Sequence, residues 1–151
     1  MTKDDDQSVA VAALLARARK LGPKLGDAAD QLNMSLETAE RELAGLKLGV
    51  YASVLLSSDE SGFEEQLAFQ KHGNAWRLVV ESGHDMQEHW TVSPLVSASR
   101  VTRREAVALL PKLLAALISK AEEEISEVEE AAREVDRFSA AVRAVREKGA
   151  T

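Results

Sequence analysis

One helical period runs through the last third of the chain and constrains its fold more than any other feature. Apolar residues recur there in steps of three, four or seven, the spacing of one face of an α-helix. They lie at Leu110, Leu114, Leu117, Ala121, Ile125, Val128, Ala132, Val135, Val142 and Val145. We therefore predict one long helix over residues 101–148. It would be roughly 70 Å long, far more than the core of a small domain requires.

The ends of this helix have recognisable signals. Thr102 and Glu105 have the spacing of a capping box, and Gly149 is the first residue suited to ending the helix. Pro111 lies inside the period, where a proline removes a backbone donor and should kink or break the helix.

The two halves of the predicted helix differ in pattern. Residues 106–118 are apolar almost all round, as expected for a segment buried between a sheet and other helices. Beyond Ala121 the apolar residues narrow to a seam that needs another helix, supplied either by the N-terminal helices or by a second subunit. The predicted partner-binding residues of this seam are Ile125, Val128, Ala132, Val135, Val142 and Val145.

The middle of the chain changes to a period of two, with β-branched and aromatic residues, and predicts an antiparallel meander of three to four strands. His72-Gly73-Asn74 is typical of a tight hairpin, and Pro94 should end the last strand. The expected strands are residues 50–57, 66–71, 76–81 and 86–93.

The N-terminal part predicts helices. Residues 8–21 form an amphipathic stretch that Gly22 and Pro23 should end. Residues 23–47 continue as one helix or as two with a turn near 33–35, and the continuous apolar register favours one. The polar residues 1–7 predict a disordered tail.

Together these patterns predict a single α+β domain over residues 8–151. Its expected parts are a helical region (8–48), a β-meander (49–95) and the long helix (101–148).

Residues 29–43 offer one alternative function, a helix-turn-helix in a DNA-binding regulator. Ala29, Asn33 and Ala39 have suitable offsets, but Glu37 and neighbouring acids would face the phosphates and repel them. The chain also carries a net charge of −6. These charges argue against nucleic acid as a partner.

A second alternative is a metal-dependent enzyme that uses His84, Asp85 and His89. The spacing of these residues is unspecific, because a strand would place the two histidines on opposite faces. The chain lacks cysteine, glycine-rich phosphate loops and a nucleophile motif. We assign no catalytic, cofactor-binding or metal residues, and expect no cofactor.

The same features set expectations for location and function. No apolar run approaches the roughly 18 residues of a membrane span, and acids stand where a signal peptide needs basic and apolar residues. The absence of cysteine fits a reducing compartment, so we expect a bacterial cytoplasmic protein. We expect a non-catalytic adaptor or chaperone-like protein that binds a protein partner or itself, as a homodimer, through the C-terminal helix.

Overall fold

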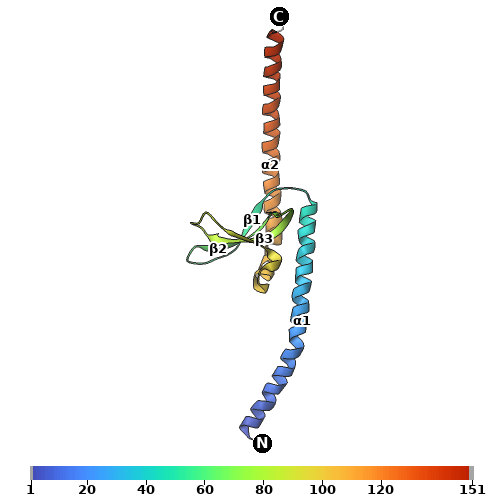
Figure 1. The fold of residues 1–151 in the computed structure, drawn as a ribbon, viewed down its shortest axis with the longest axis vertical. Helices are drawn as coiled ribbons and strands as arrows, with labels where there is room; N and C mark the ends of the chain where they lie inside the picture. Colours follow the sequence, from blue (N-terminus) through green and yellow to red (C-terminus); the bar gives the residue numbers. More distant parts are fainter. Residues whose placement is uncertain (1, 150–151) are drawn as a thin grey trace. The chain divides into compact units, whose positions relative to one another are not determined.

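The α+β class predicted from the sequence is confirmed by a computed structural model that describes residues 2–149 (Figure 1). Helix α1 (Lys3–Gly45) is followed by a four-stranded antiparallel sheet and by helix α2 (Arg100–Gly149). The chain divides into two compact units, one ending at Gly45 and the other beginning at Leu46. The expectation of a single domain over residues 8–151 stays a prediction.

Helix α1 is a continuous helix of 43 residues, where a stop at Gly22-Pro23 was predicted. That stop is wrong, because the apolar period continues in register across the proline. Pro23 removes only the hydrogen bond that a backbone N–H would donate to the carbonyl of Arg19. The helix is exposed there, so water can donate to this carbonyl instead. Residues 3–7, expected to be disordered, form the first turns; residue 1 lies outside the described residues.

The sheet is a meander in the order β1-β2-β3-β4. Its strands are β1 (Ala52–Ser58), β2 (Phe63–His72), β3 (Ala75–His84) and β4 (Thr91–Pro94). The predicted hairpin at His72-Gly73-Asn74 is confirmed, and Gly73 has a φ of 67°, a conformation that favours glycine. Strands β2 and β3 are longer than predicted.

The fourth strand begins five residues later than predicted. The N–H of Asp85 donates to the carbonyl of Gly62, and the N–H of Gln87 donates to that of His84, so the backbone turns before it can continue as a strand. Met86, the first residue of the expected strand 86–93, is 91% exposed. The pattern alone could not reveal this turn.

The core of the second unit lies between the sheet and the first half of α2. Leu67 pairs with Val80 and Phe69 with Leu78 across β2 and β3, and all four side chains are buried. Helix α2 packs against β1 and β2. It buries Arg103, Ala106, Leu113 and Leu117.

Helix α2 begins at Arg100, and its cap differs from the predicted one. The N–H of Thr102 donates to Oγ of Ser99 at 3.2 Å, so Ser99 and not Thr102 caps the helix. The helix then runs through Pro111 without a break. The carbonyl of Val107, which loses its partner to the proline, lies on an exposed part of the helix.

Residues 106–118 bury only one face of α2. Val107, Leu114 and Ile118 are exposed. The prediction that this segment is buried almost all round is therefore wrong. An apolar side of the helix remains open to solvent.

Candidate protein-binding face of the C-terminal helix

The six predicted seam residues lie on the half of α2 that extends past the sheet, drawn in orange to red in Figure 1. From Glu122 to Gly149 every residue is exposed except Ser139, which is half-buried. The valines and isoleucine of the seam are 41–70% exposed. Among the described residues of its own unit, none covers this part of the helix.

A regular heptad spacing organises the apolar residues of this half. At about 100° per residue, residues that alternate in steps of three and four fall within a stripe roughly 100° wide. Ile125 and Ala132, also predicted, lie on the flank of this stripe. We name the stripe the distal face, and its residues are Val128, Ala131, Val135, Phe138, Val142 and Val145.

Two members of the distal face, Ala131 and Phe138, were not among the predicted partner-binding residues. Phe138 is 68% exposed, and with Ala141, Val142 and Val145 it lines a shallow open groove along the helix. The signal that identifies it is the heptad step from Ala131 to Phe138 to Val145. The aromatic ring adds apolar area at the centre of the face.

The distal face is a strong candidate for a binding surface on energetic grounds. Complete burial of a Val or Phe side chain contributes about 1.5–3 kcal/mol relative to exposure. A continuous stripe of such side chains is uncommon on a protein that functions alone and marks a site of protein interaction. In the first half of the same helix, Ala106, Leu113 and Leu117 follow the same period and are buried.

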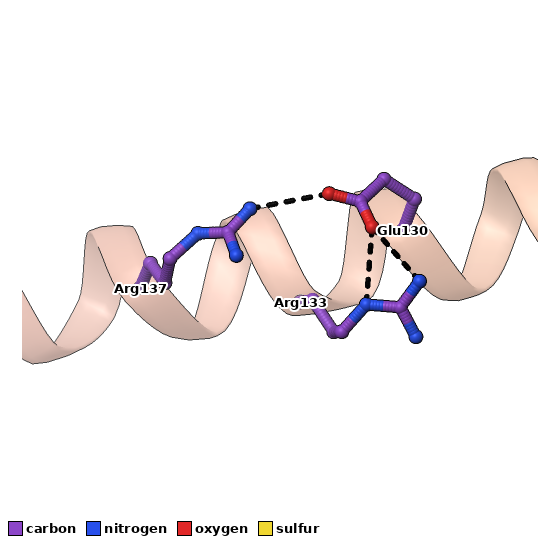
Figure 2. A network of polar contacts seen from close by, with 3 residues as sticks. All are labelled: Glu130, Arg133 and Arg137. Atoms are coloured by element: carbon purple, nitrogen blue, oxygen red, sulfur yellow. Dashed lines mark hydrogen bonds and ion pairs between the residues drawn. The ribbon is translucent and has the colours of Figure 1, made fainter.

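Charges along the distal half of α2 change sign near its middle. Residues 127–136 contain five acids and one arginine, whereas residues 137–146 contain three arginines and no acid. The side chains on either side of this reversal interact within the helix, as Figure 2 shows. Glu130 accepts hydrogen bonds from Nη2 and Nε of Arg133 at 2.8 and 3.1 Å, and from Nη2 of Arg137 at 3.2 Å.

This ion-pair network points away from the distal face: Arg133 lies nearly opposite it, and Glu130 and Arg137 lie to its sides. Glu130, Arg133 and Arg137 are each more than half exposed, so water screens the network and it contributes little to stability. A partner on the distal face would leave these charges in water. Its binding would therefore carry no desolvation cost from this network.

Helix α1 carries a second set of exposed apolar side chains in the other unit. Val11, Leu14, Leu15, Leu21 and Leu25 are all exposed. These side chains belong to the helical repeat of apolar residues from which the N-terminal helices were predicted.

The histidine and aspartate residues of the enzyme alternative belong to the end of β3 and the loop that follows. The ring of His84 meets Phe63 edge-on, with centroids 5.6 Å apart. Asp85 and His89 are exposed in the loop before β4. Within residues 2–149, no group of three or more His, Cys, Asp or Glu side chains could hold a metal ion.

Residues 29–43 do not form the two helices of a helix-turn-helix. They lie inside α1, and Thr38 donates a hydrogen bond from Oγ1 to the carbonyl of Met34 at 3.0 Å, a bond within the helix. The turn considered near residues 33–35 is absent from this described stretch. The DNA-binding alternative therefore loses its geometric basis.

Two polar groups next to strand β1 have shifted pKa values. Oδ1 of Asp59 accepts hydrogen bonds from the hydroxyl and the N–H of Ser61 and from the N–H of Phe63, and the Ser61 hydroxyl is the main cause of its lowered pKa. Burial is the main cause of the raised pKa of Tyr51, whose hydroxyl donates to Oε2 of Glu81 at 3.0 Å. Both groups stabilise local structure.

Comparison with protein-family models, with curated proteins and with solved structures finds no match to this chain. No helix within the described residues is long and apolar enough to cross a membrane. The distal face is the feature from which a function can be argued.

Proposed function

We propose that this protein is a non-catalytic adaptor or chaperone-like protein that binds a protein partner, either another chain or a second copy of itself, through the distal face of α2. One observation carries the proposal: α2 buries the apolar face of its first half in the core and exposes a similar face over its second half. A helix with such a stripe binds by packing it against another helix or into an apolar groove.

Charge supports a protein partner over a nucleic acid. The chain has a net charge of −6, and the exposed half of α2 begins with an acidic block that would repel phosphates. We propose the bacterial cytoplasm as the place of action, because a chain without cysteine suits a reducing compartment. The proposal requires no cofactor or metal.

Lysine substitutions at Val128 and Val135 test the proposal. The variant places two charges on the distal face without removing any core contact, so the chain should fold normally and lose its partner. The native mass of the full chain, alone and in bacterial lysate, reports the result. We expect complexes heavier than the 16.4 kDa monomer for the wild-type chain but not for the variant.

A matched control carries the same two charges on another face of the helix, as Ser126→Lys with Ala140→Lys. Both positions are exposed and lie outside the distal face. This variant should retain every complex. Equal losses in both variants, or a monomer under all conditions, would contradict the proposal.

A further inference from the structure

We propose that the distal face binds a second copy of this chain, with the two α2 helices antiparallel and overlapping over residues 128–145. This inference rests on the proposed function and names its partner. The pairing has a two-fold axis at the midpoint of the apolar stripe, between Asp136 and Arg137.

The position of the charge reversal supports this axis. The distal face extends from Val128 to Val145, so its midpoint falls between residues 136 and 137, where the charge changes sign. The charges that flank the distal face also change sign along the helix, from Glu127 and Glu134 to Arg146 and Lys148. An antiparallel partner centred there brings the acidic end of each flank toward the basic end of the other copy, whereas a parallel partner brings each end beside the same end and gains no opposite-charge pair.

The sizes of the side chains support the same alignment. In an antiparallel pair with this axis, Val128 lies opposite Val145, Ala131 opposite Val142, and Val135 opposite Phe138. The small alanine faces a valine, and the large phenylalanine also faces a valine. Parallel pairing would instead put alanine against alanine and phenylalanine against phenylalanine, leaving one layer underpacked and another overpacked.

The ends of the overlap are also compatible with pairing. Glu124 interrupts the heptad pattern, but in this alignment it lies beyond the apolar layers, opposite Gly149. Glu127 lies at the edge of the interface, and the nearest base on the same flank is Lys148 of the second copy, two residues from the level of Glu127. An antiparallel pair centred instead on the middle of α2, near residue 125, would oppose the two acidic blocks.

The sheets do not obstruct this dimer. Residue 121, where α2 leaves the core, is 15 to 16 residues from the axis. At 1.5 Å per residue the two copies of residue 121 are about 45 Å apart, so each sheet lies beyond the end of the paired region. The exposed halves can overlap fully.

Single cysteines in the otherwise cysteine-free full chain test the orientation. Ala131→Cys and Val142→Cys face each other only in the antiparallel alignment. We expect a short thiol crosslinker to give abundant dimer when the two variants are mixed, and little dimer when either is treated alone. In an antiparallel pair the two copies of residue 142 are roughly 16 Å apart along the axis, too far for a short crosslinker to join them.

Several results would overturn the inference. Efficient crosslinking of Val142→Cys alone indicates parallel helices. A dimeric mass without the mixed crosslink indicates another surface, including α1. A third result is a monomeric mass for the purified chain at about 100 µM, with complexes in lysate that the Val128 and Val135 substitutions abolish. This result rejects self-pairing but retains the proposed function.

A charge exchange provides an independent test. Glu127→Lys places two lysines near each other at both ends of the overlap and should weaken the dimer roughly fivefold. Adding Lys148→Glu restores opposite charges and should recover most of the affinity, as measured by sedimentation equilibrium. If the double variant is as weak as Glu127→Lys alone, the proposed alignment is wrong.

Discussion

Tyr51 is the only tyrosine of the chain, so its ionisation can be followed by ultraviolet absorbance without interference from another phenol. Burial is the largest cause and raises its pKa, a hydrogen bond with Ser53 lowers it, and Glu81 raises it, with a net shift upward. The titration midpoint of the folded protein should therefore lie above the ordinary value of 10.0. In Glu81→Gln the midpoint should fall, yet remain above 10.0 because burial is the larger cause.

The same shift predicts a dependence of stability on pH. Because the pKa of Tyr51 is raised on folding, its contribution is fully present below the pKa of the unfolded chain and is lost as the pH rises through the folded value. Unfolding by urea at pH 8 and at pH 10.5 measures this loss, with Tyr51→Phe as the control. A titration midpoint at or below 10.0 would contradict the hydrogen-bonded, partly buried geometry.

Within α2, position along the helix decides the cost of removing an apolar side chain. Leu117 is 2% exposed against the sheet, whereas Val135 is 60% exposed. We expect Leu117→Ala to lower the free energy of unfolding by about 2–5 kcal/mol, because it leaves a cavity in the core. Val135→Ala should change it by less than about 0.5 kcal/mol.

Urea unfolding at low protein concentration, where self-association is negligible, measures both variants. Similar costs for the two substitutions would show that the distal face is already covered within a single chain. Both substitutions introduce alanine into the same helix, and the helix propensities of Leu and Val lie within about 0.7 kcal/mol of that of Ala, so propensity alone cannot account for a large difference.

The elements of this fold follow closely from sequence periodicity, and the errors have local causes. The long C-terminal helix and the hairpin at Gly73 could be predicted because each has a regular pattern. The predicted stop at Pro23 was wrong because a local proline signal was given more weight than a period that stays in register. The late start of β4 depends on hydrogen bonds between distant segments, which no local pattern specifies.

The candidate site was predictable in part for similar reasons. Val128, Val135, Val142 and Val145 follow from periodicity alone. Phe138 was missed because the predicted seam stepped by seven from Val135 to Val142 and passed over it, although its heptad position places it on the distal face. Which half of the helix is buried also followed from the pattern, whereas the exposed side of residues 106–118 required the three-dimensional structure.

For the whole molecule, the proposed dimer predicts that thermal stability depends on protein concentration. Association stabilises the folded state by mass action, so the midpoint of unfolding should rise as the chain becomes more concentrated. Between 2 and 200 µM we expect roughly 5–10 °C, measured by circular dichroism. The Val128 and Val135 lysine variant should melt at one temperature throughout, and a wild-type midpoint that does not change would argue against association.

The continuity of α2 has a consequence for any assembly built on it. A bound chain joined through a flexible linker samples many orientations, and its local concentration depends on the length of that linker. Helix α2 leaves the core and reaches the distal face without a loop, so no such freedom exists between the sheet and the bound chain. The sheet therefore lies at a fixed distance and direction from the chain bound to α2. Because each helical residue adds about 100° of rotation, a change of a few residues in helix length would turn the sheet to a different side of the assembly.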